Sequence, residues 1–306
     1  MLEHSPHRPR ESSPYRGRFA PSPTGPLHFG SLVAALGSFL EARSSNGQWL
    51  LRMEDIDPPR EVAGAADDIL RTLEALGLTW DGSVIYQSAR VDAYRAALSR
   101  LAGAGRAYPC ACTRAEAMSA GKGVYPGTCR RGLPPDRGPR SWRLRVDAGS
   151  IAVVDRLQGP IGQDLSRAVG DYVLWRADGL PAYQLAVVVD DAWQGVSDVV
   201  RGCDLLESTP RQVYLQRLLG LPQPAYAHLP LAVNARGDKL SKQTAAPPVR
   251  AAKAAGELVR ALRFLGQPVP GELARAQPGA VLEWALQHWR LDRVPAVAAS
   301  HAPAGG

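Results

Sequence analysis

A stretch rich in proline and glycine, RFAPSPTGPLHFGSL at residues 18–32, stands directly before an apolar run. The first N–H groups of a helix have no partner and carry a partial positive charge, so a helix beginning here suits a phosphate or another anion. Gly25 and Gly30 would let the backbone approach a ligand closely because they lack a Cβ atom. His28 can donate a hydrogen bond to a phosphate oxygen. Taken alone, these residues are also typical of a tight turn with a surface histidine.

A second stretch, KLSKQ at residues 239–243, follows a strand-like segment and a glycine. Its lysines, Lys239 and Lys242, are two of only four lysines in the chain. Two lysines at this spacing can clamp a pyrophosphate, whose negative charge grows as it leaves. Taken alone, the stretch is equally typical of a solvated, charged loop.

The elements that would position these stretches alternate between strand and helix, a pattern that predicts a parallel α/β sheet. Between residues 108 and 139 cysteine, glycine, proline and arginine interrupt this pattern, and we expect an inserted module there. Strands are expected at residues 18–20, 48–55, 142–146, 151–155, 172–176 and 228–233, and helices at residues 29–43, 62–76, 89–103 and 210–219, with two more helices after residue 249.

The composition narrows the class of protein. The 36 lysines and arginines exceed the 29 acidic residues and give a formal charge of +7, which suits a polyanionic partner such as nucleic acid but does not require one. Residues 1–15 are polar and basic without an apolar core, so we expect a disordered leader rather than a signal peptide. No apolar stretch is long enough to cross a membrane. We therefore expect a cytoplasmic protein that makes no contact with membranes.

Three of the four cysteines, Cys110, Cys112 and Cys129, lie within twenty positions of one another. They are too few and too clustered for a disulfide framework, which favours a reducing compartment. The spacing is that of a small zinc knuckle, in which three thiolates leave one of four ligand positions open. Three reduced structural thiols are the alternative interpretation.

The two stretches together resemble a known family. PLHFGS followed at long range by KLSKQ resembles the HIGH and KMSKS signatures of class I aminoacyl-tRNA synthetases, and RFAPSPTGPLHFGS is most similar to the glutamyl group. The resemblance runs from residue 16 to residue 242. It implies a Rossmann-like parallel sheet with ATP at the carboxyl ends of the strands, where an amino-acid carboxylate attacks the α-phosphate. A carboxylate is already ionised at neutral pH, so alignment and charge stabilisation replace a general base.

The resemblance also implies which residues bind the nucleotide. Catalysis is expected from His28, Gly30, Lys239 and Lys242, and ATP binding, with Mg²⁺ on the phosphates, from His28, Gly30, Ser31 and Lys242. The last position of the KMSKS signature is Gln243 here, and Cys203 stands where the family often has glutamate. Neither departure removes a charge assigned to the chemistry.

A glutamate site follows from the same resemblance. It is expected at Arg18, Ser22, Glu54, Tyr183 and Arg201. Two arginines complement the two carboxylates of free glutamate, and one carboxylate complements its ammonium group. Any one of these charged residues, taken alone, could equally belong to a surface ion pair.

The chain is most similar to the short paralogues of that group, the glutamyl-Q tRNA(Asp) synthetases. It ends soon after KLSKQ, where an ordinary glutamyl-tRNA synthetase continues into a long anticodon-reading region, and it carries CAC followed by YPGTC. These paralogues activate glutamate without tRNA and transfer it to the queuosine base at the wobble position of tRNA(Asp). The resemblance implies Tyr125 as the fourth ligand of one structural Zn²⁺ per chain, with Cys203 as its rival.

The implied partners are L-glutamate and the queuosine-bearing anticodon stem-loop of tRNA(Asp), bound by a monomer. Two other interpretations stay open: a truncated glutamyl-tRNA synthetase that charges a tRNA 3′ end, and a non-catalytic paralogue that binds RNA or a nucleotide. We expect no anticodon-binding domain. The expected catalytic domain is Rossmann-like, with its first half at 16–107 and its second half, which carries the KLSKQ loop, at 181–246, and an inserted subdomain with the zinc knuckle at 108–180 separates the halves. A disordered leader is expected at 1–15, a short helical C-terminal region at 247–296 and a disordered tail at 297–306.

Replacing Lys242 tests the expected phosphate clamp. We expect Lys242→Ala to lower the rate of adenylate formation severely while leaving glutamate affinity nearly unchanged, because a phosphate clamp acts chiefly in the transition state. Pyrophosphate-exchange kinetics and a glutamate-binding titration measure the two quantities. A loss of glutamate affinity as large as the loss of rate would contradict this role.

Overall fold

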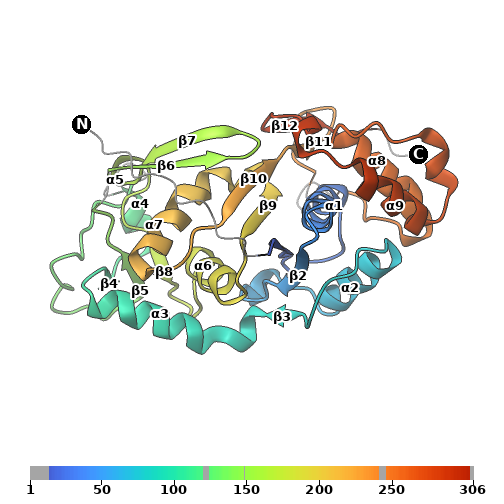
Figure 1. Ribbon diagram of the computed structural model, residues 1–306. Coiled ribbons are helices and arrows are strands. Elements are labelled where there is room, and N and C mark those ends of the chain that lie inside the picture. The colour runs from blue at the N-terminus through green and yellow to red at the C-terminus, as the bar shows by residue number, and fades with distance from the viewer. Residues whose placement is uncertain (1–13, 120–123, 148, 241–245, 304–306) are drawn as a thin grey trace.

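The computed structural model describes residues 14–119, 124–147, 149–240 and 246–303. Two sheets of mainly parallel strands form its centre (Figure 1). The first sheet has the order β1-β2-β3, with β1 at Arg16–Phe19, β2 at Gln48–Met53 and β3 at Ile85–Tyr86. The second sheet has the order β7-β6-β10-β9, with β6 at Ser150–Asp155, β7 at Gly159–Asp164, β9 at Asp198–Gly202 and β10 at Ala225–Leu229.

The two sheets adjoin at β1 and β9. The N–H of Ser197, next to β9, donates to the carbonyl oxygen of Arg16 in β1 at 2.9 Å. From this seam the first half of the chain continues through β2 and β3 on one side, and the second half through β10 and β6 on the other. In open α/β sheets such a switch point is where ligands bind, at the carboxyl ends of the strands.

Helices of the two halves pack around this seam. Helix α1 lies between the strands β9 and β10 and the C-terminal helices α8 and α9 (Figure 1). Its residues Leu32, Leu36 and Leu40 are fully buried, which is the 3.6-residue periodicity of an interior face. The helices are α1 at Phe29–Ser44, α2 at Ala65–Ala75, α3 at Val91–Gly103, α6 at Tyr183–Trp193, α7 at Thr209–Leu219, α8 at Ala254–Phe264 and α9 at Pro278–His288. Short 3₁₀ helices occur at Pro58–Arg60, Gln87–Arg90, Cys203–Ser208, Ala251–Lys253, Gly271–Arg275 and Leu291–Arg293.

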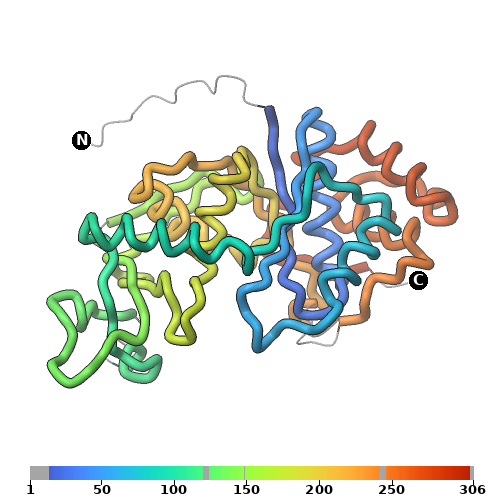
Figure 2. Tube along the Cα trace, turned by 90° about the horizontal axis from the view of Figure 1, so that it is seen from below, coloured from blue at the N-terminus to red at the C-terminus, as the bar shows by residue number. Residues whose placement is uncertain are grey.

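A third, antiparallel sheet carries the cysteine-rich segment. It has the order β4-β5-β8, and it lies at the opposite end of the molecule from the C-terminal helices (Figure 2). The elements are β4 at Ala107–Cys110, β5 at Ser141–Leu144, β8 at Val173–Trp175 and the short helices α4 at Arg114–Ser119 and α5 at Leu165–Ala168. The β6–β7 hairpin falls in the range expected for the insertion, but it joins the second sheet, where Asp155 pairs with Tyr226.

Three further segments differ from expectation. The strand expected at 228–233 is broken at Pro230, which has no N–H for a sheet ladder, so that β11 is a separate strand at Leu231–Val233. Residues 299–301, expected in a disordered tail, form β12 (Ala299–His301) because the edge of β11 offers them a parallel partner. Tyr15, expected in the disordered leader, accepts a hydrogen bond from the N–H of Gln48 at its carbonyl oxygen, while residues 1–13 lie outside the described residues.

None of the helices in the described ranges combines the length and the hydrophobicity that a membrane crossing requires.

A glycine substitution tests the packing of the C-terminal region. Gly266 has φ +71°, and a Cβ atom built on it would lie 2.2 Å from the carbonyl oxygen of Arg293. We expect Gly266→Ala to lower the free energy of unfolding by roughly 2–4 kcal/mol, since the left-handed conformation and the clash add. The control is Gly64→Ala, because Gly64 has φ +76° with nothing near its Cβ position, and its expected loss is about 1 kcal/mol. Equal losses in urea denaturation would contradict the proposed clash.

Candidate active site

The stretch at residues 18–32 forms a corner between β1 and α1. His28 is the N-cap of α1, and its Nδ1 accepts a hydrogen bond from the N–H of Ser31 at 3.3 Å. The carbonyl oxygen of Leu27 accepts from the N–H of Val249 at 2.8 Å, which joins the corner to the segment preceding α8. A backbone hydrogen bond from the C-terminal region therefore stabilises the corner at which α1 begins.

The described part of KLSKQ lies against this corner. A Cβ atom built on Gly30 would be 3.3 Å from the carbonyl oxygen of Leu240. Leu240 is itself held by its N–H, which donates to the carbonyl oxygen of Ala232 at 2.8 Å. The absence of a side chain at Gly30 thus permits a close approach between two segments about two hundred residues apart in sequence. Lys242 and Gln243 lie outside the described residues.

A cavity of about 560 Å³ opens at this contact, at the carboxyl ends of β1, β9 and β10. It lies at the switch point between the two halves of the chain, as expected for a ligand site of this fold. Every described residue of the expected nucleotide and glutamate sites lines it. These residues are Arg18, Ser22, His28, Gly30, Ser31, Glu54, Tyr183, Arg201 and Lys239.

Two arginines, of which Arg18 lines the cavity, meet one buried carboxylate. Oδ1 of Asp191 accepts hydrogen bonds from Nε of Arg18 at 3.2 Å and from Nη2 of Arg52 at 2.8 Å. Burial opposes ionisation of Asp191, but the charges of Arg18 and Arg52 hold its pKa below the usual value. Arg52 also donates through Nη1 to Oε1 of Gln194 at 2.5 Å. Asp191 on α6 therefore fixes Arg18 in the wall of the cavity.

Glu54 stands in the same wall with a perturbed acidity. Burial raises the pKa of Glu54 to about 7, although the charges of Arg52 and Arg18 act in the opposite direction. The nearest guanidinium nitrogen, Nη2 of Arg52, is 3.6 Å from Oε1 of Glu54. Near neutral pH the carboxyl group is thus partly protonated, and a cation entering the cavity would favour its ionised form.

Arg201 keeps one guanidinium nitrogen without a protein partner among the described residues. Its side chain is 4% exposed, and its Nε donates to Nε2 of His228 at 3.0 Å while Nη2 donates to Oγ1 of Thr209 at 2.9 Å. Nη1 is buried and has no partner in the described part of the chain. An unmade hydrogen bond from a buried charged group is costly, so an anionic ligand in the cavity would stabilise this arginine.

Two further groups complete the polar lining. Burial raises the pKa of Tyr183, so its hydroxyl group stays protonated and can donate a hydrogen bond. Nζ of Lys239 forms an ion pair with Oδ2 of Asp204, and both side chains are partly exposed. The ammonium group of Lys239 therefore places a positive charge in the part of the cavity lining that the KLSKQ stretch forms.

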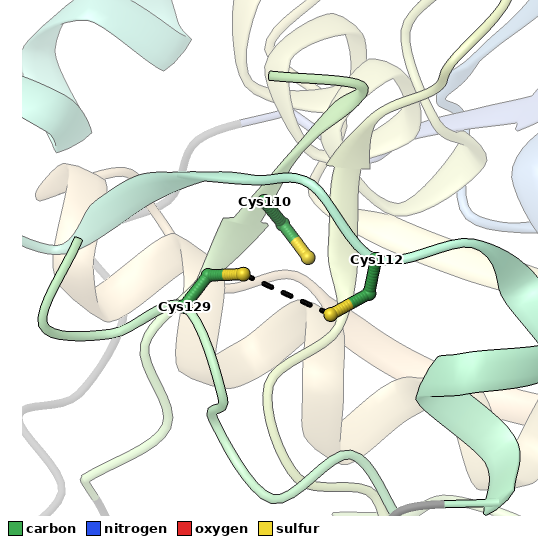
Figure 3. Close-up of side chains that lie close together, drawn as sticks. All are labelled: Cys110, Cys112 and Cys129. Atoms are coloured by element: carbon green, nitrogen blue, oxygen red, sulfur yellow. Dashed lines mark hydrogen bonds between the residues drawn. The ribbon is translucent and has the colours of Figure 1, made fainter. Parts of the chain in front are cut away.

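The three cysteines expected to bind zinc lie together at the end of β4 and in a neighbouring turn (Figure 3). Their sulfur atoms all lie within 4.8 Å of one another, with Cys112 and Cys129 3.7 Å apart. The hydroxyl oxygen of Tyr125 is 3.3 Å from the sulfur of Cys110 and 3.5 Å from that of Cys112. Cys203, the rival fourth ligand, is elsewhere, since its thiol donates to the carbonyl oxygen of His228 at 3.6 Å.

The surroundings favour a thiolate at Cys110, whereas burial raises the pKa of Cys112. Burial opposes ionisation of Cys110, but hydrogen bonds from the Tyr125 hydroxyl, the Cys112 N–H and Arg143 lower its pKa to about 7. Nε of Arg143 donates to this sulfur at 3.3 Å, and the guanidinium lies 3.9 Å from the centre of the Tyr125 ring. The three thiols could therefore hold a metal ion.

Comparisons with known proteins agree with this geometry. The family described as tRNA synthetases class I (E and Q), catalytic domain, matches residues 15–127 and 131–265. The glutamyl-Q tRNA(Asp) synthetase of Dechloromonas aromatica (strain RCB) is 63% identical over 291 residues, which cover 93% of this chain and 97% of the relative. The chain belongs to the glutamyl-Q tRNA(Asp) synthetase family. It is accordingly an enzyme, a ligase of the aminoacyl-tRNA synthetase type.

Other relatives support the same assignment. The glutamyl-Q tRNA(Asp) synthetase of Aromatoleum aromaticum is 59% identical over 295 residues, covering 95% of this chain and 93% of the relative. The crystal structure of the glutamate-tRNA synthetase from Elizabethkingia anophelis superposes with a TM-score of 0.80 at 24% identity, covering 95% of this chain and 68% of that one. At that identity the match concerns the fold alone, and it confirms the expected class I α/β fold with a parallel sheet.

Sequence reasoning missed several charged residues around the cavity. Arg52 was expected only as part of an apolar strand, although an arginine inside such a strand signals a buried partner. The adjacent pair Asp190 and Asp191 in an otherwise apolar helix carried the same signal. His228 and Asp155 lie at strand ends that look apolar, and no local pattern joins them.

For Cys203, burial raises the pKa to about 12, so this departure from the family pattern remains a neutral thiol.

The raised pKa of Glu54 predicts that its contribution to the free energy of unfolding falls as pH rises. In the folded protein the pKa of Glu54 is about 7, whereas in the unfolded chain it is about 4.3. The contribution of Glu54 to the free energy of unfolding is therefore fully present below about pH 4.3 and is lost as pH rises through about 7. Gln cannot ionise and does not show this loss. Between pH 4 and pH 8 we expect the free energy of unfolding of Glu54→Gln to rise by up to roughly 3 kcal/mol relative to that of the unmodified protein. Parallel curves of unfolding free energy against pH would contradict the raised pKa.

Proposed function

We propose that the protein converts L-glutamate and ATP into glutamyl-adenylate without tRNA, and then transfers the glutamate to the queuosine base at the wobble position of tRNA(Asp). One observation carries the proposal: the helix corner at Gly30 and the KLSKQ backbone at Leu240 meet at a cavity whose wall holds a buried arginine with an unpaired donor. The names of the relatives at 63% and 59% identity support the same substrates.

The charges of the cavity complement free glutamate. Nη1 of Arg201 would donate to one substrate carboxylate, and Arg18, held by Asp191, would attract the other. Glu54 would bind the ammonium group, which would draw off the proton that burial retains on this carboxyl group. Tyr183 and Ser22 add hydroxyl groups to the same lining. The pocket would thus select an amino acid with two carboxylates by charge and by shape.

Adenylate formation then requires alignment and charge stabilisation. The N–H groups at the start of α1, with His28, Gly30 and Ser31, would hold the phosphate chain of ATP beside the amino-acid carboxylate. The carboxylate attacks the α-phosphorus, the bond to the bridging oxygen breaks, and pyrophosphate leaves. Lys239 and Lys242 would stabilise the charge that builds on the leaving group. Mg²⁺ bound with ATP would neutralise part of the phosphate charge.

The cysteine cluster suits a structural Zn²⁺. Tetrahedral zinc with bonds of about 2.3 Å to sulfur places two sulfur atoms about 3.8 Å apart, and Cys112 and Cys129 are 3.7 Å apart. Tyr125 would supply the fourth ligand, because its hydroxyl oxygen is within 3.5 Å of the sulfur atoms of both Cys110 and Cys112. Zinc would crosslink β4 to the turn that carries Cys129 and so shape the surface of the antiparallel sheet.

The RNA partner would meet a basic protein. The formal charge of +7 favours binding to phosphates, and such binding weakens steeply with salt. A queuosine base at the wobble position belongs to a single-stranded loop, where bases can be turned out of the stack toward a cavity. We propose that a monomer in the cytoplasm binds the anticodon stem-loop in this way.

Labelled glutamate and a short RNA test the proposal. The unmodified enzyme is incubated with ATP and the anticodon stem-loop of tRNA(Asp), which lacks the 3′ end, carrying either queuosine or guanine at the wobble position. We expect glutamate-dependent ATP–pyrophosphate exchange without RNA, and label only on the queuosine-bearing stem-loop. Label on the 3′ end of whole tRNA but not on the stem-loop would identify a truncated glutamyl-tRNA synthetase. Absence of exchange would identify a non-catalytic paralogue.

Metal analysis tests the cysteine cluster. We expect about one zinc per chain in the reduced protein, and its loss in Cys129→Ser, because a serine hydroxyl is a poor replacement for a thiolate ligand. Cys203→Ser is the matched control, since Cys203 is a buried cysteine outside the cluster, and it should retain the metal. Protein without zinc, or equal loss in both variants, would contradict the assignment.

A further inference from the structure

We propose that Asp155 and His228 form a positioning pair that orients Arg201 toward the substrate carboxylate. The proposal deepens the function proposed above and rests on it. Asp155 ends β6, His228 lies in β10 and Arg201 in β9, so three neighbouring strands of the second sheet each contribute one residue. All three side chains are nearly excluded from solvent, at 2%, 0% and 4% exposure respectively.

The contacts run in one direction, from the carboxylate to the cavity. Oδ2 of Asp155 is 2.6 Å from Nδ1 of His228, and Nε2 of His228 is 3.0 Å from Nε of Arg201. Nη2 of Arg201 is bound to Thr209. These contacts occupy two of the three guanidinium nitrogens and leave Nη1 for a ligand in the cavity that Arg201 lines.

The chemistry of arginine determines the proton positions. Nε of an arginine carries a hydrogen and cannot accept, so Nε2 of His228 must present its lone pair. The imidazole proton then sits on Nδ1 and is donated to Asp155. Oδ1 of Asp155 accepts the N–H groups of Leu157, Gln158 and His228, at 3.0, 2.8 and 3.2 Å, which reserves Oδ2 for the imidazole. Asp155 thus selects the tautomer that Arg201 needs.

The surroundings keep His228 neutral. Burial and the nearby charge of Arg201 lower the pKa of His228, while the carboxylate of Asp155 acts in the opposite direction. Arg18 in β1 adds to the lowering. The remaining neighbours are uncharged: the ring of Tyr226 stacks on the imidazole, Thr209 contacts Nε2, and the Cys203 thiol contacts the backbone carbonyl. A protonated imidazole would turn an N–H group against the N–H of Arg201.

The substitution Asp155→Asn reverses this arrangement with little change in shape. The amide oxygen can keep the three backbone N–H groups, and the NH₂ group then faces Nδ1 of His228. The histidine must accept there and carry its proton on Nε2, directly against Nε of Arg201. We expect the KM for glutamate in pyrophosphate exchange to rise roughly 10- to 100-fold, the effect of losing a charge-assisted hydrogen bond, while the KM for ATP stays unchanged.

The matched control lies at the other end of the same strand as Arg201. Asp198 is also a buried carboxylate, bound to Ser197 at 2.6 Å and to Arg156 at 3.5 Å. Asp198→Asn should leave the KM for glutamate unchanged, even where it lowers the melting temperature. In a background of Arg201→Lys, adding Asp155→Asn should raise the KM for glutamate less than twofold, because the two substitutions remove the same interaction.

A spectroscopic measurement tests the pair without any variant of Asp155. In ¹⁵N-histidine-labelled enzyme, with the signal assigned through His228→Gln, we expect His228 to be neutral with its proton on Nδ1. An imidazolium or a proton on Nε2 at neutral pH would overturn the proposal. An active enzyme in which Asp155→Asn leaves the KM for glutamate unchanged, or raises the KM values for glutamate and ATP equally, would also overturn it. Absence of glutamate-dependent exchange in the unmodified enzyme would instead overturn the proposed function, and the tautomer would still be measurable.

Discussion

Buried charge at the seam between β1 and β9 is the constraint on which the rest of the site depends. A charge removed from water must be paired, or it costs several kcal/mol. Asp191 meets this requirement with two arginines from β1 and β2, and the Asp155–His228 pair does the same for Arg201 in β9. Arg18 and Arg52 come from the first half of the chain and Asp191 from the second, so the first half alone could not hold its arginines in this way.

Helix α1 connects the seam to the C-terminal region through a second buried carboxylate. Glu41, on the buried face of α1, accepts hydrogen bonds from Nε1 of Trp289 at 2.7 Å and from Nη2 of Arg156 at 2.5 Å. One carboxylate on α1 therefore joins the segment after α9 to the segment after β6, and His28 is the N-cap of the same helix. The hydrogen bond between Leu27 and Val249 adds a second connection at the corner itself. The C-terminal region thus braces the end of the cavity at which α1 begins.

Local patterns in the sequence predict what depends on local chemistry. The corner at residues 18–32, the helix that follows it and the cysteine cluster each carry their signal within a few residues, and the structure has α1 at Phe29–Ser44 against an expectation of 29–43. Pairing between distant segments has no such signal. The β6–β7 hairpin joins β10 and β12 joins β11 through backbone hydrogen bonds that any sequence can make. Likewise, Asp155 becomes a partner of His228 only when β6 and β10 are in register.

Two charged groups that line the cavity stand in unfavourable surroundings. Nη1 of Arg201 has no partner among the described residues, and burial raises the pKa of Glu54 to about 7. Both conditions destabilise the free enzyme, and both are relieved by a ligand that brings a carboxylate to one and an ammonium group to the other. A pocket already filled with internal ion pairs would be more stable and would bind such a ligand less tightly, because those pairs would have to break first. Under the proposed function, the unpaired donor and the partly protonated carboxyl group would therefore make the pocket specific for an amino acid with an additional negative charge.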